Sequence, residues 1–287
     1  MPAAILVHGG AGAWDADPAS LRIAVLACEE AAAAGMDVLR RGGSALDAVE
    51  EAVRALEDCP VLEAGRGSHP NSSGKVEMDA LIMDGRTLDF GAVAAVRGIC
   101  NPVSLARRVM TDTKHAFLVG LGAEKFADDI GFPRFSGHLS LKETETTQDT
   151  VGAVALDKDG NLAAATSTGG VRGKMPGRVG DSPIAGSGAY ADNASAAVTA
   201  TGDGEALMRI VISKQVCDLV SGGTPVQAAC EAALELLHRR LNGKGGLIAI
   251  DGRGQVGITF NTFAMPHAYA DEYGRRVSDY RPGMPPP

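Results

Sequence analysis

The chain has 287 residues, of which 45% are hydrophobic and 22% charged, with a formal net charge of −8. This balance excludes intrinsic disorder, a collagen-like chain and a coiled coil, since it supplies ample apolar material for a core. Basic residues are scattered or paired, which argues against a nucleic-acid-binding surface. Glycine (37 residues) is about twice its common usage of ~7%, and aromatic residues supply only 4%. The fold therefore depends more on main-chain conformation and on the close approach of main-chain segments than on the packing of large side chains.

The five cysteines form an odd set without a CxxC spacing. They predict reduced, mostly buried thiols in a cytoplasmic protein. No run of residues has the composition of a secretory signal, and none approaches 18 unbroken apolar residues. We therefore expect neither a leader peptide nor a membrane span.

The first half of the chain alternates between predicted strands and helices. An apolar run at residues 3–7 predicts a buried strand that leads into HGGAG at residues 8–12. A helix predicted over 18–39 stops near Gly42 and Gly43, and a second helix follows an N-cap at Ser44. Further predicted elements are a long irregular loop over 59–75, strands over 77–83 and 88–96 joined at 84–86, and short helices over 101–110 and 123–129.

The second half begins with a polar stretch, residues 131–149, that predicts an exposed linker. A hairpin follows directly, with a turn at Asp157-Lys158-Asp159-Gly160. The remaining predicted elements are hairpin strands over 150–156 and 162–167, helices over 203–220 and 224–241, and a closing hairpin over 246–251 and 255–261. The order predicts a layered α/β sandwich with mostly antiparallel sheets.

Common catalytic signatures are absent. The sequence contains no GxSxG, HExxH or GxxxxGK[ST], and its six histidines are too far apart in sequence to suggest a metal pair. The DKDG sequence at Asp157 resembles a fragment of a calcium loop, but a hairpin turn explains it better because the rest of that loop is missing.

Small hydroxyl residues and a few charges cluster between residues 150 and 204. Arg178 and Asp181 are three residues apart in a glycine-flanked loop, an arrangement suited to a zwitterion, although a local surface ion pair is the alternative. Thr201 and Gly202 offer a hydroxyl and a main-chain N–H of the kind that stabilises an oxyanion, although a plain helix N-cap is the alternative.

Thr150 opens a strand directly after the polar linker, and no histidine base is near it in the sequence. A cut before Thr150 would provide a base, because the freed α-amino group has a pKa near ~7.7–8.0. The alternative is a β-branched residue that merely begins a strand. Thr144, Thr146 and Thr147 open no strand.

Ordered motifs across nearly the whole chain resemble the plant-type L-asparaginases and isoaspartyl peptidases, which are N-terminal-nucleophile hydrolases. The motifs are HGGAG at His8, GGSALDAVEEAVRALED at Gly42, AGRGS at Ala64, VEMDALIMDG at Val76, NPVSLARRVM at Asn101, TVGAVALD at Thr150, ATSTGG at Ala165, GRVGDSP at Gly177, ATGDGE at Ala200, GGLIAID at Gly245 and FNTFAMP at Phe260. The resemblance implies a four-layer αββα sandwich that forms a single domain from two chains.

The resemblance also implies self-cleavage between Asp149 and Thr150, with Gly9 taking part, into an α subunit of residues 1–149 and a β subunit of residues 150–287. Thr150 is then the nucleophile, and its amine is the base. After self-cleavage the protein is expected to be a hydrolase that acts on the side-chain amide of L-asparagine and on β-aspartyl dipeptides.

The remaining roles are carried over from the same family. Thr168 would support the nucleophile, Arg178 and Asp181 would clamp the α-carboxylate and α-amino groups of the substrate, and Thr201 and Gly202 would form the oxyanion hole. Gly204 would complete the substrate loop.

The resemblance implies a structural sodium ion, no catalytic cofactor, and a dimer of αβ heterodimers without nucleic-acid or membrane partners. The sodium ligands would be the main-chain oxygens of Leu56, Glu57, Leu62, Ala64 and Arg66.

The chain departs from the family pattern at two positions. Asp149 precedes the nucleophile where the family usually has glycine, and Glu63 replaces an asparagine that approaches the substrate, which adds a negative charge near the site. An Asp-Thr junction also occurs in the related glycosylasparaginases, which remain an alternative. In a different class, HGGAG after a strand could be the phosphate-binding loop of a nucleotide-binding module.

Overall fold

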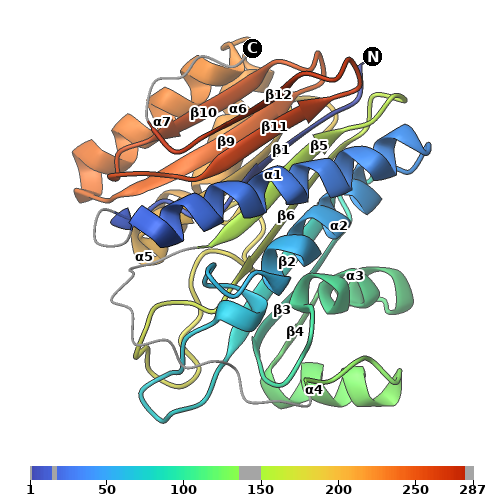
Figure 1. Ribbon diagram of the computed structural model, residues 1–287, viewed down its shortest axis with the longest axis vertical. Helices are drawn as coiled ribbons and strands as arrows, with labels where there is room; N and C mark the ends of the chain where they lie inside the picture. The colour runs from blue at the N-terminus through green and yellow to red at the C-terminus, as the bar shows by residue number, and fades with distance from the viewer. Residues whose placement is uncertain (1, 15–17, 136–149, 282–287) are drawn as a thin grey trace.

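The computed structural model describes residues 2–14, 18–135 and 150–281, which form an α/β fold with two β-sheets (Figure 1). The larger sheet has eight strands in the order β12-β11-β1-β5-β6-β2-β3-β4, and only the β3–β4 pair is parallel, so this sheet is mixed. Its strands are β1 (Ala4–His8), β2 (Met78–Asp84), β3 (Phe90–Val96), β4 (Phe117–Val119), β5 (Val151–Leu156), β6 (Leu162–Thr168), β11 (His267–Asp271) and β12 (Arg276–Asp279).

The smaller sheet is antiparallel throughout, in the order β10-β9-β8-β7. Its strands are β7 (Ala189–Ala191), β8 (Ala196–Gly202), β9 (Gly245–Asp251) and β10 (Val256–Phe260). An apolar cluster with members from both sheets, including Leu6, Val154 and Ile248, fills the space between them. Alanine is frequent in this cluster, and Phe260 and Tyr269 are its buried aromatic members.

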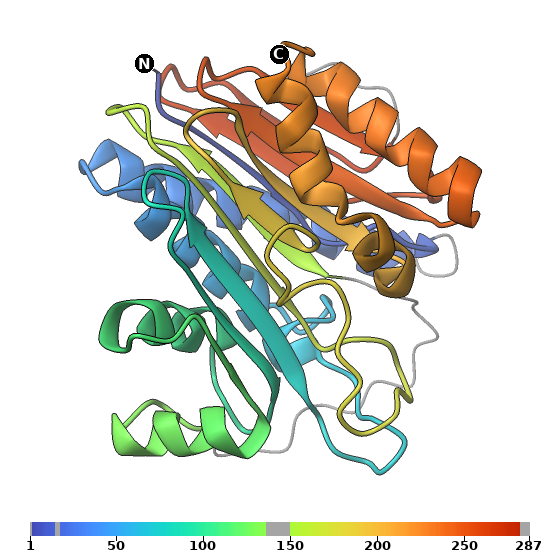
Figure 2. The same ribbon diagram turned by 180° about the vertical axis from the view of Figure 1, so that it is seen from behind.

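The helices pack on the two sheets (Figures 1 and 2). They are α1 (Pro18–Arg40), α2 (Ala45–Asp58), α3 (Pro102–Asp112), α4 (Gly120–Asp129), α5 (Gly204–Ile210), α6 (Ile212–Ser221) and α7 (Val226–Leu241). The alanine-rich faces of α1 and α2 pack on the larger sheet in one apolar cluster, and α6 and α7 pack on the smaller sheet in another.

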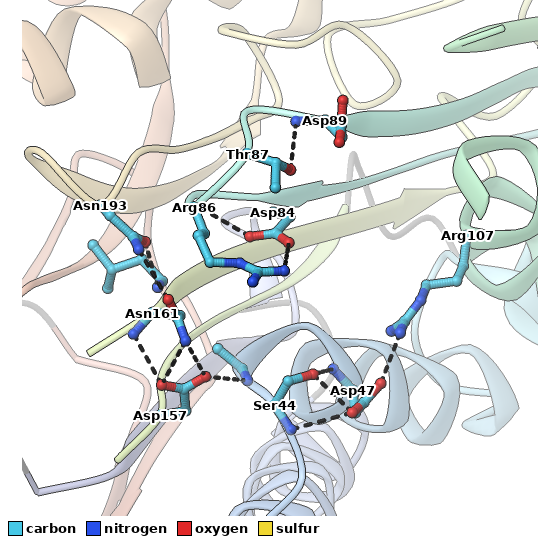
Figure 3. Close-up of polar contacts among 12 residues, drawn as sticks. Ser44, Asp47, Asp84, Arg86, Thr87, Asp89, Arg107, Asp157, Asn161 and Asn193 are labelled. Atoms are coloured by element: carbon cyan, nitrogen blue, oxygen red, sulfur yellow. Dashed lines mark hydrogen bonds and ion pairs between the residues drawn. The ribbon is translucent and has the colours of Figure 1, made fainter. Parts of the chain in front are cut away.

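The predicted N-cap of α2 is confirmed. Ser44 and Asp47 form a capping box, in which the Ser44 hydroxyl accepts from the Asp47 N–H and the Asp47 carboxylate accepts from the Ser44 N–H. Asp157 in the β5–β6 turn accepts a hydrogen bond of 3.2 Å from the Ala45 N–H and others from Asn161 (Figure 3). The Asp157 carboxylate therefore accepts hydrogen bonds within the hairpin turn and at the N-terminus of α2. The contacts within the turn support the hairpin interpretation of DKDG.

Three expectations from the sequence were wrong in detail. The helix predicted over 203–220 is broken into α5 and α6, because Val211 adopts a left-handed conformation with φ of 52°. Strands β11 and β12 follow the hairpin that was expected to close the chain, and the short strands β4 and β7 were not predicted.

The linker predicted over residues 131–149 lies mostly outside the described residues, and its first five residues are exposed or half-buried and hydrogen-bonded to the rest of the fold. The Phe135 N–H donates to the Gly98 carbonyl at 2.9 Å, and the Arg134 guanidinium donates to the Arg97 carbonyl at 2.9 Å. Residues 131–135 therefore belong to the folded unit.

Candidate active site

Thr150 stands at the start of β5, the strand between β1 and β6 in the larger sheet. It is buried, and its Oγ1 lies 3.1 Å from Ser182 Oγ, within hydrogen-bond distance. A small cleft at this point is lined by Thr150, Thr168, Gly170, Val171, Arg178, Gly180, Asp181, Ser182 and Gly202. Five of the predicted site residues therefore meet at one cleft, whereas Asp149 lies outside the described residues.

Thr168 ends β6, and its Oγ1 accepts a hydrogen bond of 3.0 Å from the Gly170 N–H. The antiparallel register that pairs Val151 with Ser167 brings the end of β6 beside the start of β5. Ser182 was not predicted. Its only sequence signal was its place after Asp181 in GDSP, and its contact with Thr150 required the fold.

Arg178 has an ion-pair partner that the sequence did not predict. Its Nε and Nη2 donate to the two carboxylate oxygens of Glu205 at 2.9 and 2.7 Å. This is a bidentate pair whose Glu205 side is exposed. The guanidinium is thus paired with Glu205, and not with Asp181 as the predicted alternative of a local ion pair required. Glu205 follows Gly204 in the TGDGE sequence, which gave no local sign of this contact.

The Asp181 carboxyl is buried, and its Oδ2 has no hydrogen-bond donor among the described residues. Burial raises the pKa of Asp181 to about 7, an effect that the nearby Arg178 guanidinium opposes only in part. A Cβ atom on Gly204 would lie 2.9 Å from Asp181 Oδ1, so glycine permits the close packing of these two segments. A cation that entered the cleft would supply the partner that this carboxylate lacks.

Thr201 and Gly202 belong to strand β8, and the N-cap of α5 is Asp203, so the N-cap alternative for Thr201 is wrong. Thr201 Oγ1 accepts a hydrogen bond of 3.2 Å from the Ala11 N–H. Since that N–H occupies one lone pair, the Thr201 O–H remains available as a donor. Gly202 lines the cleft, whereas Thr201, Gly204 and Glu63 are not among its lining residues.

The HGGAG sequence is buried at residues 8–12, and the Gly9 N–H donates to the Pro266 carbonyl at 2.8 Å. Gly9 follows β1 at the end of the sheet where β5 begins. The N–H groups of Ala11 and Gly12 likewise donate within the protein, to Thr201 Oγ1 and the Ala264 carbonyl, so they are not available to a phosphate group, which argues against the nucleotide-binding alternative.

His8 corrects the expectation that no histidine lies near the nucleophile. Its imidazole contacts the main chain of Thr150 and fills the space above Gly152, where a Cβ would lie 2.4 Å from His8 Nε2. Burial lowers the pKa of His8 to about 3, so the ring is neutral. Neither ring nitrogen of His8 has a hydrogen-bond partner among the described residues, so His8 is not hydrogen-bonded to the Thr150 hydroxyl.

Glu63 forms a buried pair with His69, with Oε1 and Nε2 separated by 2.8 Å. The Glu63 carbonyl also accepts a hydrogen bond of 2.6 Å from the Gly169 N–H. Glu63 is thus joined by its main chain to the segment that follows Thr168. The expectation that Glu63 adds a negative charge near the site therefore has to include its partner His69, which the sequence did not identify.

The loop after α2 brings main-chain carbonyl groups close to two glycines. A Cβ on Gly67 would lie 1.7 Å from the Leu62 carbonyl oxygen, and one on Gly65 would lie 2.3 Å from the Glu57 carbonyl oxygen. The Ala64 carbonyl accepts from the Gly67 N–H at 3.1 Å. Carbonyl oxygens are ligands suited to hard cations, so the donor set of this loop fits such an ion.

All five cysteines are free thiols, three of them buried and two partly exposed. Within the described residues there is no cluster of three or more histidine, cysteine, aspartate or glutamate side chains that could hold a metal ion. No helix among those residues is both long enough and apolar enough to cross a membrane.

Comparisons with known proteins agree with the motifs. The family model described as asparaginase matches residues 1–146 and 135–278. A Danio rerio protein named isoaspartyl peptidase/L-asparaginase is 44% identical over 93% of this chain and 92% of its own length. An Escherichia coli protein named isoaspartyl peptidase is 44% identical over 93% and 92%. A Pyrococcus abyssi protein named plant-type L-asparaginase is 44% identical over 94% and 96%. The chain therefore belongs to the asparaginase family.

Proposed function

We propose that this protein is an autoprocessed threonine hydrolase that cleaves the side-chain amide of L-asparagine and the isopeptide bond of β-aspartyl dipeptides. The observation that carries the proposal is the surroundings of the Thr150 hydroxyl. Its hydrogen-bond partner is another hydroxyl, Ser182, and no side-chain base is hydrogen-bonded to it among the described residues. A threonine hydroxyl needs a base, and cleavage between Asp149 and Thr150 would provide one in the new α-amino group.

The charges around the cleft support an aspartyl substrate with free main-chain ends. Arg178 suits the α-carboxylate because its guanidinium retains hydrogen-bond donors beyond the two used by Glu205. Asp181, whose Oδ2 has no donor among the described residues, suits the α-ammonium. Such a clamp recognises the aspartyl moiety and leaves the group on the other side of the scissile bond unspecified. The relatives named isoaspartyl peptidase and L-asparaginase act on bonds of this kind.

In the proposed reaction the α-amino group of Thr150 removes the hydroxyl proton, and Oγ1 attacks the side-chain carbonyl carbon of the substrate. Negative charge develops on the carbonyl oxygen, where the Thr201 hydroxyl and the Gly202 N–H donate hydrogen bonds. The protonated amine then gives its proton to the leaving nitrogen, which departs as ammonia or as the amine of the second residue. Water hydrolyses the β-aspartyl ester and regenerates Thr150, while Thr168 supports the nucleophile throughout.

The proposal extends to the layered fold, the two subunits and their assembly. The packing of α1 and α2 on one sheet and of α6 and α7 on the other supports the four-layer αββα sandwich of N-terminal-nucleophile hydrolases. The subunits would be residues 1–149 and 150–287, with Gly9 contributing to cleavage, and two such heterodimers would pair. The free thiols support a reducing compartment such as the cytoplasm.

We also assign a structural sodium ion to the loop after α2. Its ligands would be the main-chain oxygens of Leu56, Glu57, Leu62, Ala64 and Arg66. When bound, the ion would hold the loop that carries Glu63, and no step of the reaction passes through it.

The test combines a denaturing gel with kinetics. Wild type should yield two fragments of roughly half the chain each, and Thr150→Ala should remain intact and inactive, whereas Thr150→Ser should be processed and retain activity. Hydrolysis rates are then measured on asparagine, β-Asp-Leu and a glycosylated asparagine. Full activity of uncleaved Thr150→Ala would refute the mechanism, and turnover of the glycosylated substrate alone would indicate a glycosylasparaginase.

A further inference from the structure

The loop from Gly170 to Arg178 is anchored by a buried cation. Over residues 172–177 only Lys174 is buried, with 4% of its surface exposed, whereas its neighbour Met175 is 76% exposed. Apolar side chains usually hold such loops, because burying an ammonium group carries a large desolvation penalty. The position of Lys174 therefore requires compensating contacts.

Those contacts join the loop to the segment before β2. Lys174 Nζ donates to the Glu77 carbonyl at 2.9 Å, and the Gly177 N–H donates to the Glu77 carboxylate at 2.9 Å. The Ser72 N–H donates to the Lys174 carbonyl at 2.8 Å. Glu77 thus binds the loop at two points, one of them directly before Arg178.

A buried carboxyl group, that of Asp79, interacts electrostatically with Lys174. Asp79 lies on β2 opposite Thr168 of β6, and its Oδ1 accepts from the Ala95 N–H at 2.7 Å. Its Oδ2 has no donor among the described residues. Burial raises the pKa of Asp79 and lowers the pKa of Lys174, and the attraction between the two charges opposes both shifts only in part. The charges of Lys174 and Asp79 are therefore coupled inside the fold, next to the strand that carries Thr168.

The Lys174 ammonium also lies directly against the cleft wall. A Cβ on Gly170, which has φ of +72°, would lie 2.8 Å from Lys174 Nζ. Gly170 and Arg178, the two ends of the loop, both line the cleft. Movement of the ammonium would therefore change the separation between Arg178 and the Thr150–Thr168 pair.

We propose that Lys174, together with Glu77 and Asp79, is a positioning residue that fixes the substrate loop and thereby the carboxylate-binding geometry of Arg178. This proposal rests on the proposed function, in which Arg178 binds the α-carboxylate of the substrate. Lys174 touches no reacting atom. Its removal should weaken substrate binding and leave the chemical step at Thr150 largely unchanged.

The test compares Lys174→Met, which retains much of the length and apolar stem of lysine without its charge, with Met175→Ala as the control in the same loop. Lys174→Met should raise KM for asparagine and β-Asp-Leu about tenfold or more, as expected for a displaced binding group, while kcat stays within about threefold and the chain still cleaves. Met175→Ala should change neither constant. An unchanged KM in Lys174→Met would overturn the proposal.

A second variant keeps the test decisive if Lys174→Met fails to fold because Asp79 is left unbalanced. The double variant Asp79→Asn/Lys174→Met removes both charges and should show the same rise in KM. Limited trypsin digestion provides a readout that does not depend on activity, since cleavage after the exposed Arg172 should accelerate in both variants. Inactive wild type would refute the proposed function alone, whereas unaccelerated cleavage after Arg172 would refute the role of Lys174.

Discussion

Replacing Asp181 with asparagine should stabilise the fold while it removes substrate binding. Burial raises the pKa of this carboxyl from 3.8 to about 7. Between these two values the folded chain holds a proton that the unfolded chain has released. The stability associated with the neutral carboxyl is therefore complete below about pH 4 and is lost as the pH rises to about 7.

The difference between the two pKa values corresponds to at most about 4 kcal/mol, at 1.36 kcal/mol per pH unit. Asparagine has the shape of aspartate and does not ionise. The gain in the free energy of unfolding for Asp181→Asn should thus be near zero at about pH 4 and reach a plateau above about pH 7. Glu57, whose pKa burial raises to about 8, titrates in both chains and cancels from the difference.

The measurement is urea-induced unfolding from about pH 4 to about pH 8.5, made in a Thr150→Ala background so that a single uncleaved chain unfolds. The exposed carboxyl of Asp159 provides the matched control, and Asp159→Asn should show no such pH-dependent gain. Equal stability of Asp181→Asn and its parent at about pH 8.5, or a gain confined to about pH 4, would refute the reasoning.

The same substitution in the self-cleaving chain should lower kcat/KM for asparagine about a hundredfold, because the substrate ammonium loses a buried ionic partner. Wild type itself should bind substrate more weakly as the pH falls below about 7, where Asp181 becomes protonated. An unchanged KM between about pH 8 and about pH 5.5 would contradict the assignment of Asp181 to the ammonium group.

Three further variants test other contacts. Ser182→Ala removes the hydroxyl that lies 3.1 Å from Thr150 Oγ1. In steady-state kinetics it should lower kcat about tenfold with little change in KM. A kcat within twofold of wild type would exclude a role for this contact. Glu205→Gln weakens an exposed ion pair to Arg178 and should raise KM only about threefold, so a hundredfold loss would show that the pair contributes far more than surface pairs do. Gly67→Ala forces a Cβ to within 1.7 Å of a carbonyl oxygen and should destabilise the fold by about 1–3 kcal/mol. If wild type has a higher melting temperature in NaCl than in KCl, scanning calorimetry of Gly67→Ala should show no such difference. A Gly67→Ala variant that keeps the difference would contradict the sodium assignment.

The features predicted best were those whose causes are local in sequence. The capping box at Ser44 and the β5–β6 hairpin around Asp157 depend on residues within a few positions of each other, so their patterns were visible in the chain. Left-handed Val211 shows the limit of such patterns, because valine carries no sequence signal for that conformation and the predicted single helix was wrong.

The residues of the candidate site likewise fall into those that local sequence identified and those that only the fold brought together. Thr150, Arg178 and Asp181 were identifiable because glycine-rich motifs and the strand boundary marked their positions. Glu205 and Ser182 were missed as partners, since each contact joins segments whose separation is set by the whole fold.

The sequence by itself determined the family, the order of most elements and five of the residues that line the cleft, because motifs and hydrophobic periodicity are local properties of the chain. The tertiary structure decided which groups face each other. It paired Glu63 with His69 and gave Arg178 an exposed carboxylate instead of Asp181. It also left the Asp181 carboxyl buried with a pKa near neutrality. Burial and contact depend on the packing of distant segments, and they set both the charge of a side chain and the partner available to it.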